Sequence, residues 1–376
     1  MRYLISFLLV SCFLPITQAQ QVDRQAAFHF NEAVMAFKSN DYETAISAYG
    51  KAISIDPNYT KARYNRAKAY LRVKSYKNAI GDLNEVVKTD PSHTNAWKYK
   101  GYAYMQMKVY PGAINSYNKA LELDDKLNDC RANRAIAYMN EGKVKLAHAD
   151  LIHVVKEEPD NGNVLYNLAI CQNKMKDVDG ALQTYSQLIA IGHKPEMASK
   201  QRAKILVNKK EYAQAITDLD EAISSGKSGC EDYYLRGYCK LKTEDLEGAD
   251  KDFKMAISID QTHKPSIQNK AFTSYKLEKY DEAVKDFTKV LEITPGDKNT
   301  HVNRGLSSLK LKDYKSAHSD FSKVIELDPQ HATAYYNRAS AAIGLAQNDD
   351  ACTDMRTAAK LGFQEAFNHI RQICKD

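Results

Sequence analysis

A 34-residue repeat limits the possible folds of this chain more than any other feature of its sequence. If position 1 of the repeat is placed at Ala26, position 20 is Ala in all ten copies that follow. Position 8 is always Ala or Gly, and position 24 is always large and apolar or aromatic. No insertion breaks this register between residues 26 and 365. The chain therefore grows by copying one structural unit, and its 376 residues do not indicate two or three unrelated domains.

Each copy predicts two antiparallel helices. Positions 4, 8 and 11 share one face of a first helix, and positions 17, 20, 24 and 27 share one face of a second helix. The small residues at positions 8 and 20 let the two backbones approach closely, and the larger residues fill the space around them. In several copies Asp-Pro near positions 31 and 32 ends the second helix. No segment alternates like a β-strand, so the sequence predicts an all-α fold.

Two copies, the fifth and the sixth, lack the Asp-Pro turn. Residues 192–195 and 226–229 contain Gly at the end of the second helix instead. Glycine adopts the left-handed conformation of a helix C-cap easily, so we expect alternative caps at these two places. A local change of pitch or a hinge is the alternative interpretation.

The third copy carries the most complete motif. Its residues are Trp97, Gly101, Tyr104, Ala113, Tyr117 and Ala120. With this motif the chain resembles the tetratricopeptide repeat (TPR) family over residues 26–365. The resemblance implies a right-handed α-solenoid superhelix of about ten helix-turn-helix repeats, whose first helices line a concave groove. Residues 366–376 form an apolar-striped segment, which we expect to be a helix that caps the open end of the stack. The ending that contains Cys352 and Cys374 is similar to the closing segment of many secreted bacterial repeat proteins.

The first 19 residues have the pattern of a secretory signal peptide. Arg2 precedes an apolar run that is too short to span a bilayer, and Thr17 and Ala19 fit a small-residue cleavage pattern. We expect cleavage after Ala19, a tail over residues 20–25, and secretion across a membrane into a bacterial periplasm. Lipid attachment at Cys12 and a buried first helix are the alternatives. No other apolar stretch is long enough to cross a membrane, so no transmembrane span is expected in the mature chain.

Charged residues at repeat positions 7 and 23 occur together. Position 7 is basic in the copies where position 23 is Asp, which predicts an ion pair or hydrogen-bonded brace between the two helices, within a copy or to its neighbour. An Arg ladder for anionic ligands is the alternative, but a ladder needs no matching acids. The pairs are Arg66/Asp82, Arg134/Asp150, Arg202/Asp218, Arg236/Asp252, Lys270/Asp286, Arg304/Asp320 and Arg338/Asp354.

The sequence contains no pattern of catalytic, cofactor or metal chemistry. The 10 His residues are scattered, and no phosphate-binding Gly-rich loop or nucleophile elbow occurs. Paired acidic residues fall at turns or helix starts, where we expect them to cap helices and not to act as catalytic dyads. The net charge of +6 is spread over the whole chain and gives little support for nucleic-acid binding. We expect a non-enzymatic protein without cofactor or metal.

Six cysteines remain after removal of the signal. An oxidising compartment permits disulfides. Cys230 and Cys239 lie on one helix, too far apart to bond. Cys352 and Cys374 could pin the capping helix to the last repeat, and the sequence leaves this open.

The binding surface is expected on the first helices. In the TPR family, positions 2, 5, 9, 12 and 13 form the concave face. Here those positions carry many tyrosines with lysines beside them, which suits an extended peptide or a partner helix with apolar and acidic groups. The candidate residues are Tyr64, Lys68, Lys98, Tyr102, Tyr166, Tyr234, Tyr238, Phe272, Tyr275 and Tyr336.

The sequence leaves open whether these rings bind a partner at all. The rings could instead pack on neighbouring first helices and face solvent only in part. Of the 24 Tyr, fourteen fall at packing positions and seven at concave ones. We therefore expect a protein–protein interaction scaffold, with a glycan- or peptidoglycan-binding envelope component as the alternative function.

Overall fold

The computed structural model describes residues 18–374, and this range contains helices joined by short connections, with no strand. Twenty helices form ten pairs that match the ten predicted copies, and one more helix follows them, so the predicted all-α fold is confirmed. The helices are α1 (Gln18–Lys38), α2 (Tyr42–Ile55), α3 (Thr60–Arg72), α4 (Tyr76–Thr89), α5 (Thr94–Gln106), α6 (Tyr110–Leu123), α7 (Asn128–Asn140), α8 (Val144–Glu157), α9 (Gly162–Lys174), α10 (Val178–Ala190), α11 (Pro195–Asn208), α12 (Tyr212–Ser224), α13 (Cys230–Lys242), α14 (Leu246–Ile259), α15 (Lys264–Lys276), α16 (Tyr280–Ile293), α17 (Lys298–Lys310), α18 (Tyr314–Leu327), α19 (Ala332–Gly344), α20 (Asn348–Lys360) and α21 (Gln364–Ile373).

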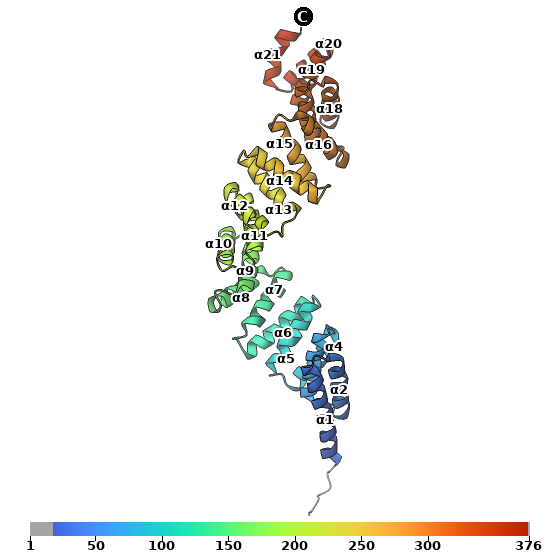
Figure 1. Cartoon of the computed structure of the whole chain (residues 1–376), viewed down its shortest axis with the longest axis vertical. Helices are drawn as coiled ribbons and strands as arrows, with labels where there is room; N and C mark the ends of the chain where they lie inside the picture. The colour runs from blue at the N-terminus through green and yellow to red at the C-terminus, as the bar shows by residue number, and fades with distance from the viewer. Residues whose placement is uncertain (1–17, 375–376) are drawn as a thin grey trace, which may run out of the picture. The chain divides into compact units, whose positions relative to one another are not determined.

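The helices belong to two compact units, which meet within α10, between Ala181 and Leu182. In each unit a first helix packs against the second helix of its own copy, and that second helix packs against the first helix of the next copy (Figure 1). Neighbouring first helices also contact each other, whereas neighbouring second helices lie further apart. The first helices therefore form the more closely spaced, inner face of each unit.

The core of each copy lies where the sequence places it. Ala at position 20 is fully buried in every copy, and the aromatic rings at position 24, such as Tyr117 and Phe253, are buried against position 8. A Cβ atom added to Gly101 would lie 2.6 Å from the ring of Tyr117. The small residue at position 8 is therefore needed because the opposite ring occupies the space beside its backbone.

The turn between the two helices of a copy has the same backbone conformation throughout. Position 15 takes a left-handed conformation in all ten copies, with φ between 58° and 73°, although only Gly142 among these residues is a glycine. Nine copies therefore hold a side chain in a conformation that costs about 1 kcal/mol. Gly192 and Gly226 also have positive φ, so the alternative caps expected after copies five and six are present.

All seven predicted pairs at positions 7 and 23 form, and each joins the two helices of one copy. Arg304, for example, donates from Nε to Asp320 Oδ2 at 2.9 Å and from Nη2 to Asp320 Oδ1 at 2.7 Å. The aspartates are buried, so the two-point contacts of the six arginines and the single bond of Lys270 satisfy carboxylates that would otherwise be costly.

Five of the arginines make a further hydrogen bond that links consecutive copies. Nη1 of Arg304 donates to Oγ1 of Thr288, position 25 of the preceding copy, at 3.0 Å. Each such arginine braces its own helix pair and the neighbouring second helix at once. The other four bonds run from Arg134 to Asn118, Arg202 to Ser186, Arg236 to Asp220, and Arg338 to Ser322.

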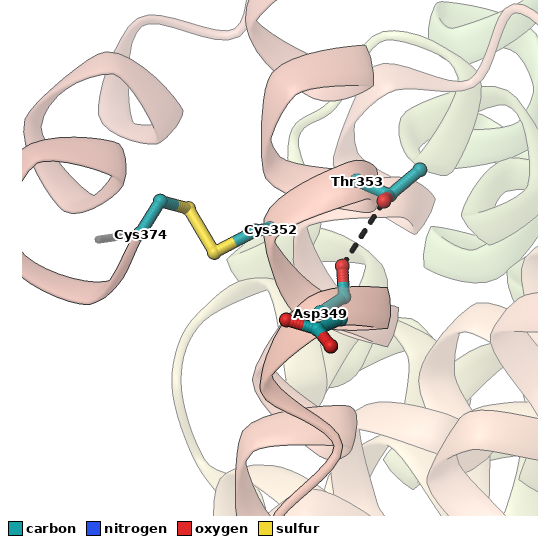
Figure 2. The surroundings of a disulfide bond; sticks show 4 residues. All are labelled: Asp349, Cys352, Thr353 and Cys374. Carbon is teal, nitrogen blue, oxygen red and sulfur yellow. Dashed lines mark hydrogen bonds between the residues drawn. A yellow bond between two sulfur atoms is a disulfide. The ribbon is translucent and has the colours of Figure 1, made fainter. Parts of the chain in front are cut away.

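The capping helix α21 closes the second unit. Its buried Ala366 and half-buried Ile370 join the core of the last repeat. Cys352 on α20 and Cys374, directly after α21, form a disulfide with Cα atoms 5.5 Å apart (Figure 2). The bond that the sequence left open is thus present. At the other end, residues 20–25 form part of α1, and the signal residues 1–17, with Cys12, lie outside the described residues.

Candidate functional site

The inner face of the first unit contains a small groove across three consecutive first helices, α1, α3 and α5. It encloses about 240 Å³. The sequence predicted two of its lining residues, Lys68 and Tyr102, as partner-binding. The full lining is Phe37, Lys68, Leu71, Arg72, Tyr99 and Tyr102.

Aromatic rings and cations share this groove. Nζ of Lys68 lies 5.5 Å from the centroid of the Phe37 ring and 5.7 Å from that of Tyr64. These distances allow cation–π attraction, which holds the ammonium over the rings. Tyr102 is 41% exposed and Arg72 is also exposed, so one ring and one guanidinium face solvent beside the apolar surface. The groove therefore offers an apolar floor, an accessible phenol and two positive charges.

The tyrosines at position 5 serve mainly as packing residues. The ring of Tyr64 lies 4.6 Å from that of His93, which precedes the next first helix, and the ring of Tyr234 lies 5.2 Å from His263 in the same way. Burial raises the pKa of Tyr64 to about 12, so its hydroxyl stays protonated. These two rings lie half-buried between neighbouring repeats.

Tyr336 contacts the capping helix. Its ring lies 4.9 Å from Phe363, and its hydroxyl is 3.1 Å from Nδ1 of His369 on α21. The capping helix therefore covers part of the surface that the sequence assigned to a partner at this position.

Lys98 and Tyr166, the other two candidates in the first unit, already have partners. Lys98 on α5 forms an ion pair with Asp129 on α7. Burial lowers the pKa of Lys98, but this contact outweighs burial, and the net shift is upward. Tyr166 on α9 is half-buried and engaged by its neighbours. Lys98 therefore links two helices of the protein itself.

The remaining candidates form an aromatic row on the inner face of the second unit. The rings of Tyr234 and Tyr238 on α13 lie 6.4 Å apart, and Lys242 lies 5.3 Å from the Tyr238 centroid. On α15, Tyr275 packs against Tyr280, and Phe272 carries a lysine 5.7 Å from its ring. These four aromatic rings on α13 and α15 are half-buried.

The candidate residues predicted from the sequence did not include four residues of this groove, Phe37, Leu71, Arg72 and Tyr99. Phe37 stands at position 12 and Leu71 at the same position one copy later, and Tyr99 stands at position 6. Position 12 belongs to the concave set, so Phe37 was open to prediction from the sequence. Tyr99 lies outside that set, and its ring reaches the groove because it packs 6.0 Å from Tyr64.

The described residues provide no metal centre and no membrane span. No group of three or more His, Cys, Asp or Glu between residues 18 and 374 is placed to hold a metal ion. No helix in that range is both long enough and apolar enough to cross a bilayer.

Helix pairs stacked in a fixed register, with a shared inner face, define a helical-repeat protein. A family model described as TPR repeat matches residues 35–74. Models described as Tetratricopeptide repeat match residues 61–128 and 302–351, 138–205, and 233–263 and 265–297. Together these matches span most of the chain, and the chain belongs to the tetratricopeptide repeat family.

Several solved structures are similar to this chain at low sequence identity. YrrB, described as a TPR protein with an unusual peptide-binding site, is 19% identical, with a TM-score of 0.46, over 49% of this chain and 95% of its own. A tetratricopeptide repeat protein from Parabacteroides merdae is 18% identical, with a TM-score of 0.45, over 66% of this chain and 99% of its own. MamA is 18% identical, with a TM-score of 0.44, over 46% of this chain and 94% of its own. Among curated proteins no match is found.

Proposed function

We propose that this protein is a non-catalytic scaffold that holds a segment of a partner protein in the inner groove of its first unit. The observation that carries the proposal is the combination of the exposed Tyr102 ring, the apolar floor and two cations in one groove. Aromatic and Arg side chains contribute much of the binding energy at protein interfaces. The partner segment would carry apolar or aromatic groups together with Asp or Glu.

The groove favours a protein segment over a compact substrate. It is shallow, about 240 Å³, and Arg72 and Lys68 lie on neighbouring turns of α3. Such a surface suits successive side chains of an extended peptide or of one helical face. Sugar stacking on Tyr102 is the alternative, since flat rings also bind glycans, and the experiment below distinguishes the two.

Binding is tested by fluorescence anisotropy with labelled peptides that combine Asp or Glu with Phe and Leu. The same peptides with Asn and Gln in place of the acids serve as charge controls. The double variant Tyr102→Ala/Arg72→Gln should weaken binding of the acidic peptides at least tenfold. Lys310→Gln, which alters the residue equivalent to Arg72 in the ninth copy, should leave binding within twofold of wild type.

The outcomes separate the proposed functions. Soluble peptidoglycan fragments that bind the wild type and not the double variant, with no peptide binding, would establish the glycan alternative. Peptide binding that the double variant retains in full would refute the groove assignment.

We further propose that the mature chain works outside the cytoplasm, in a bacterial periplasm, after removal of residues 1–19. The disulfide between Cys352 and Cys374 supports this, because such bonds persist in oxidising compartments. Fractionation of cells expressing the full chain, followed by mass determination of its N-terminus, tests both the location and the cleavage point. Unprocessed protein in the cytoplasm would contradict the proposal.

A further inference from the structure

The outer surface of the second unit has grooves between successive second helices. Three of them share lining residues at repeat positions 7, 19, 22, 23 and 25, and the largest of the three also reaches positions 4, 26, 28, 29 and 32. The groove between α10 and α12 encloses about 300 Å³, and the one between α16 and α18 about 240 Å³. The groove between α14 and α16 encloses about 620 Å³, twice as much or more. Because the backbone repeats with a fixed period, the side chains must account for this difference.

An arginine spans each of the two smaller grooves. Arg202 binds Asp218 of its own copy and, through Nη1 at 2.8 Å, Ser186 on the preceding second helix. The guanidinium of Arg304 spans its groove between Asp320 and Thr288 in the same manner. In both places a planar group with several donors ties the walls together.

Lysine replaces this arginine in the large groove. Lys270 has a single ammonium, which donates to Asp286 Oδ2 at 2.5 Å and lies 3.5 Å from Glu282. Position 25 of the preceding copy is Lys254, which cannot accept a hydrogen bond from another cation. The bridge that an arginine makes across the two smaller grooves is therefore missing here, although Lys279 at the start of α16 still lies 3.5 Å from Glu247 on α14, and the groove stays open.

The open groove has an apolar floor and a cationic rim. Ile267 is buried and Ile257 is half-buried at its base. Four lysines and two carboxylates line it, so the positive charge is in excess. The residues are Lys254, Ile257, Ser258, Gln261, Ile267, Lys270, Glu282, Lys285, Asp286 and Lys289.

The lysines differ in how far protein carboxylates already neutralise them. Lys254 is paired with the buried Asp250 at 2.6 Å. Lys289 lies 3.4 Å from Asp286, which is already shared with the lysine at position 7. Lys285 is exposed and forms no ion pair within residues 18–374. Lys285 and Lys289 therefore have donors available for an added anion.

We propose that the outer groove between α14 and α16 binds a small multivalent anion that carries two or more phosphate or carboxylate groups. Ammonium groups bind such oxygens as compact point charges, and a volume of about 620 Å³ falls in the range of small-molecule sites. This site lies on the second helices, whereas the inner groove lies on the first helices of the other unit. An anion bound here would restore the missing bridge between the seventh and eighth copies.

Isothermal titration calorimetry of the full mature chain at low ionic strength tests the site. The probes are pyrophosphate and citrate, with acetate as the monovalent control. We expect both multivalent anions to bind at least tenfold more tightly than acetate, and Lys285→Gln/Lys289→Gln to weaken them at least tenfold. Lys323→Gln changes the residue equivalent to Lys289 one copy later and should leave binding within twofold. Binding of pyrophosphate alone would assign the site to phosphates, and binding of citrate alone to carboxylates.

A second variant closes the groove and keeps Lys285 and Lys289, the two lysines proposed to hold the anion. Lys254→Ser/Lys270→Arg recreates the arrangement of Ser186 and Arg202, and should abolish anion binding while circular dichroism and the thermal midpoint stay at or above wild type. If the multivalent anions bind wild type no more tightly than acetate, or bind the closed variant as tightly as wild type, the proposal is overturned. If the closed variant does not fold, the glutamine variants decide.

Discussion

Replacing Arg304 by lysine isolates the contribution of one brace. The guanidinium makes two bonds to Asp320, which is 3% exposed, and one to Thr288 of the preceding copy. A lysine at this position should keep a single bond to the carboxylate, as Lys270 does with Asp286. One charged bond of about 1.5–3 kcal/mol and one bond to a hydroxyl of about 1 kcal/mol are then lost. We expect Arg304→Lys to destabilise this region by about 2–4 kcal/mol.

The measurement must be local, because long repeat arrays do not unfold in a single two-state step. Native-state hydrogen exchange followed by mass spectrometry reports the opening of α16 to α19 directly. A loss of about 2–4 kcal/mol corresponds to exchange that is roughly 30- to 700-fold faster in these helices. Arg356→Lys is the control, since Arg356 is exposed and forms no hydrogen bond or ion pair with the residues that the structure describes. Exchange in Arg304→Lys within threefold of wild type would refute the view that the brace stabilises the stack.

Three further predictions concern packing, the cap and thiol ionisation. Gly237→Ala places a Cβ atom 2.9 Å from the Phe253 ring and should lower stability by about 1–3 kcal/mol despite better helix propensity. In the control Gly296→Ala the added Cβ atom has no neighbour within 4 Å, so the stability should not change. Equal thermal midpoints for the two variants would contradict the predicted effect of the Phe253 ring. Reducing the disulfide, which closes a 22-residue separation, should cost about 3 kcal/mol and speed hydrogen exchange in α21; unchanged exchange there would count against it. Burial raises the pKa of Cys130 from 9.0 to about 12, so this thiol stays protonated at pH 8. It should react with a disulfide reagent only after the protein is unfolded by denaturant. Labelling of Cys130 in the folded protein would contradict this prediction.

The repeat register predicted the fold and the braces because both follow from spacing alone. Residues 16 apart, such as Arg304 and Asp320, meet across one helix pair whenever the register holds. The third bond of the brace escaped prediction because position 25 has no fixed identity. Asn118, Ser186 and Thr288 share only the ability to accept a hydrogen bond. A pattern of residue types does not reveal a chemical property that several types share.

The candidate site was harder to predict because it depends on what the next copy contributes. Periodicity places Tyr64 on the inner face of α3, but the residue 29 places further on, His93, buries that ring. Tyr102 stays exposed, and Lys98, on the same helix, instead binds Asp129. Side-chain direction follows from the helix a residue belongs to, whereas exposure depends on the neighbouring repeat.

In a solenoid built by copying, identical backbones give every copy the same grooves, so binding chemistry must arise where copies differ. The outer groove opens where Lys270 and Lys254 replace the pairing of arginine with a hydroxyl or amide. The inner groove forms where Phe37 and Arg72 fall at positions that carry other residue types in every other copy. Both candidate sites are therefore departures from the repeat on a conserved frame. The same braces that hold the frame fixed let such departures accumulate, since a lost bridge at one junction leaves the bonds at the other junctions in place.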